Sequence, residues 1–169
     1  MSAYEEHQRA AERIVGRCAI LTLSDTRDES TDKSGARIRE MLFADAHAVT
    51  HYEVLRDDPD LLNAKLTALL TRDDVDAILA NGGTGISRRD ATVPVIEAVI
   101  ESPLPGFGEL FRMLSWEQIG SGAMLSRAIG GIAQGKVIFA MPGSTKAVEL
   151  AMTKLILPEI RHILRELRK

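Results

Sequence analysis

The fold of this chain is decided by the stretch Asp76-Ala77-Ile78-Leu79-Ala80-Asn81-Gly82-Gly83-Thr84-Gly85-Ile86-Ser87-Arg88-Arg89-Asp90. Its first five residues are mostly apolar, as in a buried strand, and a helical pattern begins near Thr92. Glycines between the two let bare backbone N–H groups approach an anion closely, and the arginines can add charge-assisted hydrogen bonds to phosphate. The stretch therefore predicts a strand that ends in a phosphate-binding turn before a helix.

On both sides of this stretch, strand patterns alternate with helix patterns. Residues 17–24 and 136–141 are apolar runs typical of buried strands, and residues 47–55 alternate as a half-buried strand does. Helices are predicted from residue 34 or 35, after Pro59, from Thr92, over residues 107–116 and after Ser144, where Pro158 should kink or split the last one. Residues 124–132 fit either a short helix or a strand. The alternation predicts an α/β fold with a parallel sheet covered on both faces.

Polar loops follow several of these strands. In such sheets, ligands bind beyond the carboxyl ends of the strands, so the loops are expected to converge on one crevice. Each loop also has a purely structural interpretation: a tight connection at the glycines, an Asx turn at Asp25, and helix caps at Asp58, Asp90 and Ser144. Convergence is the stronger signal, and it involves Ser24-Asp25, Asp57-Asp58, residues 82–90 and Pro142-Gly143-Ser144.

The residue types in these loops indicate phosphate chemistry. Asp57 and Asp90 reach the same edge from separate strands, and two carboxylates suit a magnesium-assisted phosphoryl or nucleotidyl transfer. The glycines match neither a Walker P-loop nor a dinucleotide-binding turn. Glu109 and Arg112 fit a surface pair on a helix, and they also fit the wall of a pocket.

Composition excludes several classes of protein. The chain has 169 residues, a net charge of −3 and 45% hydrophobic residues, which suits one domain and argues against a general nucleic-acid binder. A single cysteine, Cys18, cannot form an internal disulfide, and we expect a cytoplasmic protein without a signal peptide or membrane span. Residues 1–13 are interpreted as an N-terminal extension, and residues 14–169 as a single domain.

Taken together, the motifs resemble the MoaB/MogA family of molybdenum cofactor biosynthesis proteins, and its MoaB branch in particular. The resemblance extends from about residue 17 to residue 167. It rests on the order of five segments: Leu21-Thr22-Leu23-Ser24-Asp25, residues 81–90, Pro105-Gly106-Phe107-Gly108-Glu109, Ser126-Arg127 and Met141-Pro142-Gly143-Ser144.

The resemblance implies a three-layer α/β/α sandwich with a mostly parallel, doubly wound sheet that binds molybdopterin. It implies adenylyl transfer from Mg-ATP to the molybdopterin phosphate, with release of pyrophosphate. Asp57 and Asp90 match the catalytic aspartates and would hold Mg²⁺. The implied binding residues for the nucleotide or pterin are Asp25, Gly82, Gly83, Thr84, Gly85, Arg89, Glu109, Pro142, Gly143 and Ser144.

The family resemblance also implies binding partners, and it leaves two alternative functions open. A homo-oligomer, either a trimer or a hexamer, is expected, together with contact with the protein that inserts molybdenum; nucleic acid and membrane are not expected. The first alternative is a catalytically silent molybdopterin-binding protein of the same fold. The second is a nucleotide hydrolase of the same domain family.

Overall fold

The computed structural model describes residues 4, 6, 11–88 and 90–169, and within them a six-stranded sheet has the order β2-β1-β3-β6-β5-β4. Strands β1 (Arg17–Leu23), β2 (Ala48–Leu55), β3 (Ala77–Asn81) and β6 (Lys136–Met141) are parallel. Strands β5 (Ile129–Ala133) and β4 (Ser102–Pro103) extend the sheet in antiparallel pairing. The predicted, mostly parallel sheet is confirmed.

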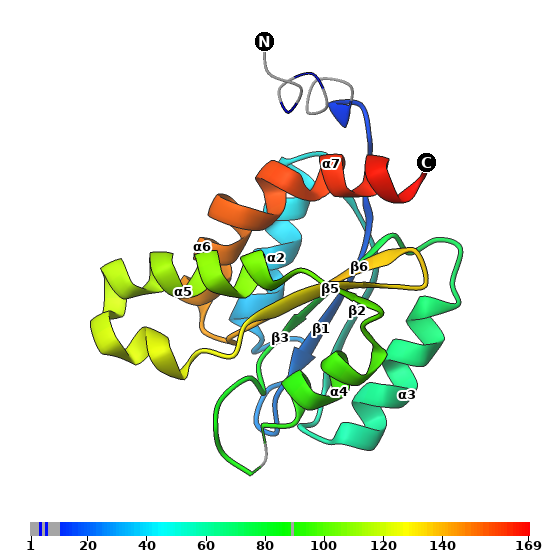
Figure 1. The fold of residues 1–169 in the computed structure, drawn as a ribbon. Helices are drawn as coiled ribbons and strands as arrows, with labels where there is room; N and C mark the ends of the chain where they lie inside the picture. The colour runs from blue at the N-terminus through cyan, green and yellow to red at the C-terminus, as the bar shows by residue number, and fades with distance from the viewer. Residues whose placement is uncertain (1–3, 5, 7–10, 89) are drawn as a thin grey trace.

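Helices cover both faces of the sheet (Figure 1). One layer contains α2 (Lys33–Ala44), α5 (Pro105–Ile119), α6 (Thr145–Ala151) and α7 (Leu157–Leu167). The other layer contains α3 (Pro59–Leu70) and α4 (Thr92–Val99). The three-layer α/β/α sandwich that the resemblance implied is therefore present.

The central strands are apolar along their whole length because each serves two cores. In β1, Cys18 and Ile20 face the α2–α5–α6–α7 layer, whereas Ala19 and Leu21 face the α3–α4 layer. Successive side chains of a strand point to opposite faces, so a strand buried on both sides shows a continuous apolar run. This explains why β1, β3 and β6 are the clearest strands in the sequence.

The last helical region is split, as Pro158 predicted. A π-helical turn, η2 (Met152–Ile156), separates α6 from α7, and the N–H of Leu157 donates to the carbonyl of Met152 five residues earlier. Proline has no N–H to continue the ordinary helical pattern, and it occupies the first turn of α7. The wider turn places Thr153 and Lys154 beside a groove described below.

Two regions add detail that the sequence pattern left open. Residues 120–125 form a 3₁₀ turn, η1 (Gly120–Leu125), and strand β5 follows it, so residues 124–132 contain the end of a turn and the start of a strand. Most of the predicted N-terminal extension lies outside the described residues. The ring of Tyr4 meets that of His162 edge-on, with 5.9 Å between centroids, which places Tyr4 beside α7. Among the helices of the described residues, none has the length and apolar character needed to span a bilayer.

Candidate functional site

Gly82 joins the carboxyl ends of three strands. Its φ of +93° favours glycine, and a Cβ there would lie 2.2 Å from the carbonyl oxygen of Leu23 at the end of β1. Its N–H donates to the carbonyl of Met141 at 3.1 Å, and a Cβ on Gly143 would come within 3.0 Å of the Gly82 Cα. The loops after β1, β3 and β6 therefore meet with bare backbone in contact.

Gly83 joins two further segments to this edge. Its φ is +59°, and a Cβ there would lie 2.4 Å from Oδ1 of Asp57 and 2.3 Å from Oγ1 of Thr92. The two oxygens thus flank the same point, one from the loop after β2 and the other from the first residue of α4. Because any side chain at position 83 would displace these two oxygens, the glycine keeps open the space between Gly83, Asp57 and Thr92. This space is called the acidic corner below.

Three carboxylates gather here. Oδ1 of Asp25 accepts a hydrogen bond from the N–H of Asp57 at 3.2 Å. Burial raises the pKa of the Asp57 carboxyl, and the negative charges of Asp25 and Asp90 raise it further. An ionised Asp57 is therefore costly in the folded protein, and a bound cation would remove that cost.

The same corner holds polar atoms without partners. Within the described part of the chain, the buried atoms Oδ1 of Asp57 and Oγ1 of Thr92 make no hydrogen bond. No group of three or more His, Cys, Asp or Glu side chains among the described residues forms a metal cage by itself. This donor set fits Mg²⁺, which typically binds one or two carboxylates together with substrate phosphates and water.

Asp90 differs from Asp57 in its surroundings. Its Oδ2 accepts a hydrogen bond from the N–H of Ser87 at 2.7 Å. The hydroxyl and N–H of Ser87 lower the pKa of Asp90, with smaller help from the N–H of Gly85 and the charge of Arg127. Asp90 is thus held as a carboxylate that closes the glycine turn, next to an Asp57 whose pKa is raised.

A buried polar network supports the turn from beneath. Nδ2 of Asn81 donates to Oγ1 of Thr22 at 2.8 Å, and Oδ1 of Asn81 lies 2.8 Å from Oγ of Ser34. Arg27 reaches the same region, with Nη1 donating to Ser34 at 3.0 Å and to the carbonyl of Gly143 at 3.2 Å. These contacts fix the end of β3 against β1, the start of α2 and the loop after β6.

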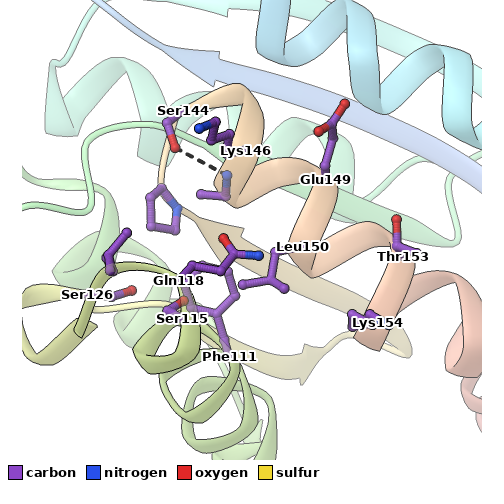
Figure 2. Close-up of a pocket in the computed structure, with 13 residues that line it drawn as sticks. Phe111, Ser115, Gln118, Ser126, Ser144, Lys146, Glu149, Leu150, Thr153 and Lys154 are labelled. Atoms are coloured by element: carbon purple, nitrogen blue, oxygen red, sulfur yellow. Dashed lines mark hydrogen bonds between the residues drawn. The ribbon is translucent and has the colours of Figure 1, made fainter. Parts of the chain in front are cut away.

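A groove of about 730 Å³ begins beside the Pro142-Gly143-Ser144 loop and runs between α5 and the α6–η2 region. Figure 2 shows Ser144 at one end, where its hydroxyl accepts from the N–H of Ala147 at 3.2 Å and caps α6. The groove combines an apolar floor with hydroxyl, amide and ammonium groups. Its lining includes Phe111, Ser115, Gln118, Leu150, Lys146 and Lys154.

The structure brings most of the predicted site residues together and separates others. Asp25, Asp57, Asp90 and the glycines share the carboxyl edge of the sheet, with Pro142 and Gly143 adjoining and Ser144 leading into the groove. Thr84 is in the same turn but its side chain is buried. Glu109 lines a different hollow of about 350 Å³, with Glu97 and Arg112. Arg89 lies outside the described residues.

Sequence reasoning missed three residues that shape this edge: Thr92, Asn81 and Arg127. The sequence pattern marks Thr92 only as the start of a helix, and it places Asn81 and Arg127 only within recognisable segments. Arg127 donates to the carbonyls of Thr84, Gly85 and Asp90. The signal for Arg127 was its place in the Ser126-Arg127 segment, but its target lies about forty residues earlier and sequence spacing does not reveal it.

Known proteins share this architecture. Residues 19–162 match a family model described as a probable molybdopterin binding domain. Molybdenum cofactor biosynthesis protein B of Halalkalibacterium halodurans is 52% identical over 98% of this chain and 97% of its own length.

Solved structures agree. A crystal structure of a molybdenum cofactor biosynthesis protein B is 52% identical, with a TM-score of 0.90 over 92% of this chain and 97% of that one. The tungsten cofactor synthesizing protein MoaB of Pyrococcus furiosus is 34% identical, with a TM-score of 0.82 over 92% of this chain and 98% of its own. The chain therefore belongs to the MoaB/MogA family of molybdenum cofactor biosynthesis proteins.

Proposed function

We propose that this protein transfers AMP from Mg-ATP to the terminal phosphate of molybdopterin. The observation that carries the proposal is the acidic corner beside the glycine turn. There, Oδ1 of Asp57 is buried with no hydrogen bond to any described residue, and the charges of Asp25 and Asp90 raise the pKa of its carboxyl further. Clustered carboxylates of this kind suit a cation, and the adjoining backbone N–H groups suit phosphate. Mg-ATP supplies both the cation and the phosphates.

In the proposed reaction, a phosphate oxygen of molybdopterin attacks the α-phosphorus of ATP. A new P–O bond forms as the bond between the α-phosphorus and its bridging oxygen breaks, and pyrophosphate leaves with the electron pair. Asp57 and Asp90 would hold Mg²⁺, which offsets the negative charge that otherwise repels the attacking oxygen. The turn at Gly82–Gly85 would bind phosphate oxygens through its N–H groups.

The groove beside Ser144 is the proposed site for the pterin. Its apolar floor at Phe111 and Leu150 suits a flat ring, and Lys146 and Lys154 suit an anionic substrate. Because the groove starts at the loop that touches Gly82, a phosphate at its near end would lie next to the nucleotide. Pro142 and Gly143 would then separate the two substrates.

A homo-oligomer, trimeric or hexameric, is also proposed. Six large apolar side chains are 46–77% exposed on α5 and η1, which project beyond the sheet in Figure 1: Leu110, Met113, Trp116, Ile119, Met124 and Leu125. Patches of this kind commonly mark protein interfaces. Light scattering on the purified chain measures the oligomeric state directly. We further propose a cytoplasmic location and contact with the protein that inserts molybdenum.

The test is an assay with molybdopterin, ATP and Mg²⁺ that measures adenylylated pterin and pyrophosphate. Wild-type protein should form both in equal amounts. Asp90→Ala should lower turnover on the order of 1000-fold, because one magnesium ligand and the closure of the turn are lost. Pterin binding and the unfolding temperature should change little. Asp74→Ala is the matched control, since Asp74 is an exposed aspartate paired with Arg72 away from this edge.

The outcomes separate the alternatives. Retained turnover in Asp90→Ala would contradict the assignment of that residue. Pterin binding without any AMP-linked product in the wild type would indicate a silent binding protein. ATP consumption that is independent of pterin would indicate a nucleotide hydrolase of the same fold.

A further inference from the structure

Arg127 binds the backbone of the glycine turn through its side chain. It follows η1, and its half-buried side chain reaches across to the loop after β3. Its Nε donates to the carbonyl of Thr84 at 3.2 Å, and its Nη2 donates to the carbonyl of Asp90 at 2.8 Å and to that of Gly85. One guanidinium thus donates hydrogen bonds to three carbonyls of a single turn.

These contacts orient the peptide units of the turn. In a trans peptide, the carbonyl and the following N–H point in opposite directions. The carbonyl of Gly83 accepts from the N–H of Thr92 at 3.2 Å, and the carbonyl of Gly85 accepts from Arg127. The N–H groups of the same two peptide units belong to Thr84 and Ile86. Both point away from those donors, and neither donates to another described residue.

We infer that Arg127 is a positioning residue that holds the carbonyls of Thr84, Gly85 and Asp90 and so leaves the N–H of Ile86 directed toward a nucleotide phosphate. The N–H of Thr92 orients the peptide unit of Thr84 in the same way. This inference rests on the proposed function for the identity of the ligand, but the ordering of the turn is independent of it. The positive charge also lies next to Asp90 and helps to keep that side chain ionised beside the turn.

An arginine suits this task better than a lysine. The guanidinium is a rigid planar fork with several N–H donors, so it can satisfy carbonyls in different directions at once. A lysine ammonium carries the same charge on a single point at the end of a flexible stem. Arg127→Lys therefore separates the role of charge from the role of the fork.

The experiment compares Arg127→Ala and Arg127→Lys with wild type. Arg72→Ala is the matched control, because Arg72 also binds a backbone carbonyl, that of Thr50, but at the amino edge of the sheet. Hydrogen exchange of the amides of residues 83–90 reports the order of the turn without substrate. Adenylyl transfer gives kcat and the KM values for ATP and molybdopterin, and added guanidinium ion tests rescue of Arg127→Ala.

In Arg127→Ala, we expect faster exchange confined to the turn and a fall in kcat/KM for ATP on the order of 100-fold. The KM for molybdopterin should stay near that of the wild type, and millimolar guanidinium should restore part of the lost activity. Arg127→Lys should behave like the alanine variant in exchange. Arg72→Ala should change neither the exchange of the turn nor the KM for ATP.

Unchanged exchange in Arg127→Ala, or full function in Arg127→Lys, would overturn the inference. If the wild-type protein forms no adenylylated pterin, the proposed function fails, and the exchange measurement alone decides whether Arg127 orders the turn. The two failures are therefore distinguishable.

Discussion

The amino and carboxyl edges of the sheet shift the pKa of a buried aspartate in opposite directions. At the amino edge, Asp76 accepts hydrogen bonds from the backbone and guanidinium of Arg17 at 2.8–2.9 Å, and Arg168 lies 3.1 Å away. These partners outweigh the cost of burial and lower the pKa of Asp76 to about 2. At the carboxyl edge, burial and two neighbouring carboxylates raise the pKa of Asp57.

This difference in pKa distinguishes a carboxylate that stabilises the fold from one that belongs to the candidate site. At the amino edge the buried aspartate and histidine side chains have partners: His47 is likewise buried there, with Nδ1 accepting from the N–H of Gly16 at 2.9 Å and Nε2 lying 3.1 Å from Asp45. Among the described residues, the neutral hydroxyl of Thr50 is a buried group there that makes no hydrogen bond. At the carboxyl edge, Oδ1 of Asp57 and Oγ1 of Thr92 are buried and make no hydrogen bond within the described part of the chain. A buried polar group without a hydrogen bond costs free energy, so these two oxygens support a site that a ligand completes.

Removing the charge of Asp76 should have the largest effect on stability. Asp76→Asn keeps the shape of the side chain but leaves Arg17 and Arg168 facing a neutral amide. We expect the free energy of unfolding to fall by about 2–3 kcal/mol, near the lower end for a broken buried pair because Arg17 can regain water. Chemical denaturation at neutral pH measures this change. A loss smaller than that of the exposed control Asp74→Ala would contradict the structural role of Asp76.

Sequence reasoning succeeded where local pattern and chain topology suffice. The apolar runs of β1, β3 and β6 identified the sheet, and the rule that strand ends share an edge brought Asp57 to the glycine turn. The sequence pattern is ambiguous at β5, where it fits either a helix or a strand, because Gly130 and Gly131 weaken the strand pattern. Those glycines are needed because a Cβ on either would crowd Phe139 or Ile100.

Long-range contacts and uncovered surfaces were not predictable. Leu110 follows the same helical period in α5 as Phe107 and Phe111, yet Leu110 is exposed while the two phenylalanines are buried. A helical period identifies an apolar face but does not say whether this chain or another molecule covers it. For the same reason, the reach of Arg127 to the glycine turn could be found only from the fold.

Lowering the pH should remove the stability that Asp76 contributes at the amino edge of the sheet. The pKa of Asp76 is lowered in the folded state, so its contribution is fully present above the ordinary pKa of an aspartate and is lost as the pH falls through about 2. A shift of this size corresponds to about 2 kcal/mol. The gap in unfolding free energy between wild type and Asp76→Asn should therefore narrow between about pH 5 and pH 2. Urea denaturation across this range measures the gap, and a constant gap would show that ionisation of Asp76 is not its source.

The smallest expected change in the free energy of unfolding is an increase, and it follows from replacing Asp57. The pKa of Asp57 is raised in the folded state, so its ionised form destabilises the fold, and Asp57→Asn should raise the free energy of unfolding by less than about 1 kcal/mol. This gain should be present at neutral pH and disappear below about pH 4, where the wild-type carboxyl is protonated in both states. Denaturation at the two pH values measures it, with Asp76→Asn as the comparison of opposite sign. A variant less stable than wild type at neutral pH would mean that the charge of Asp57 is already compensated within the chain, and Asp57 would then need no cation.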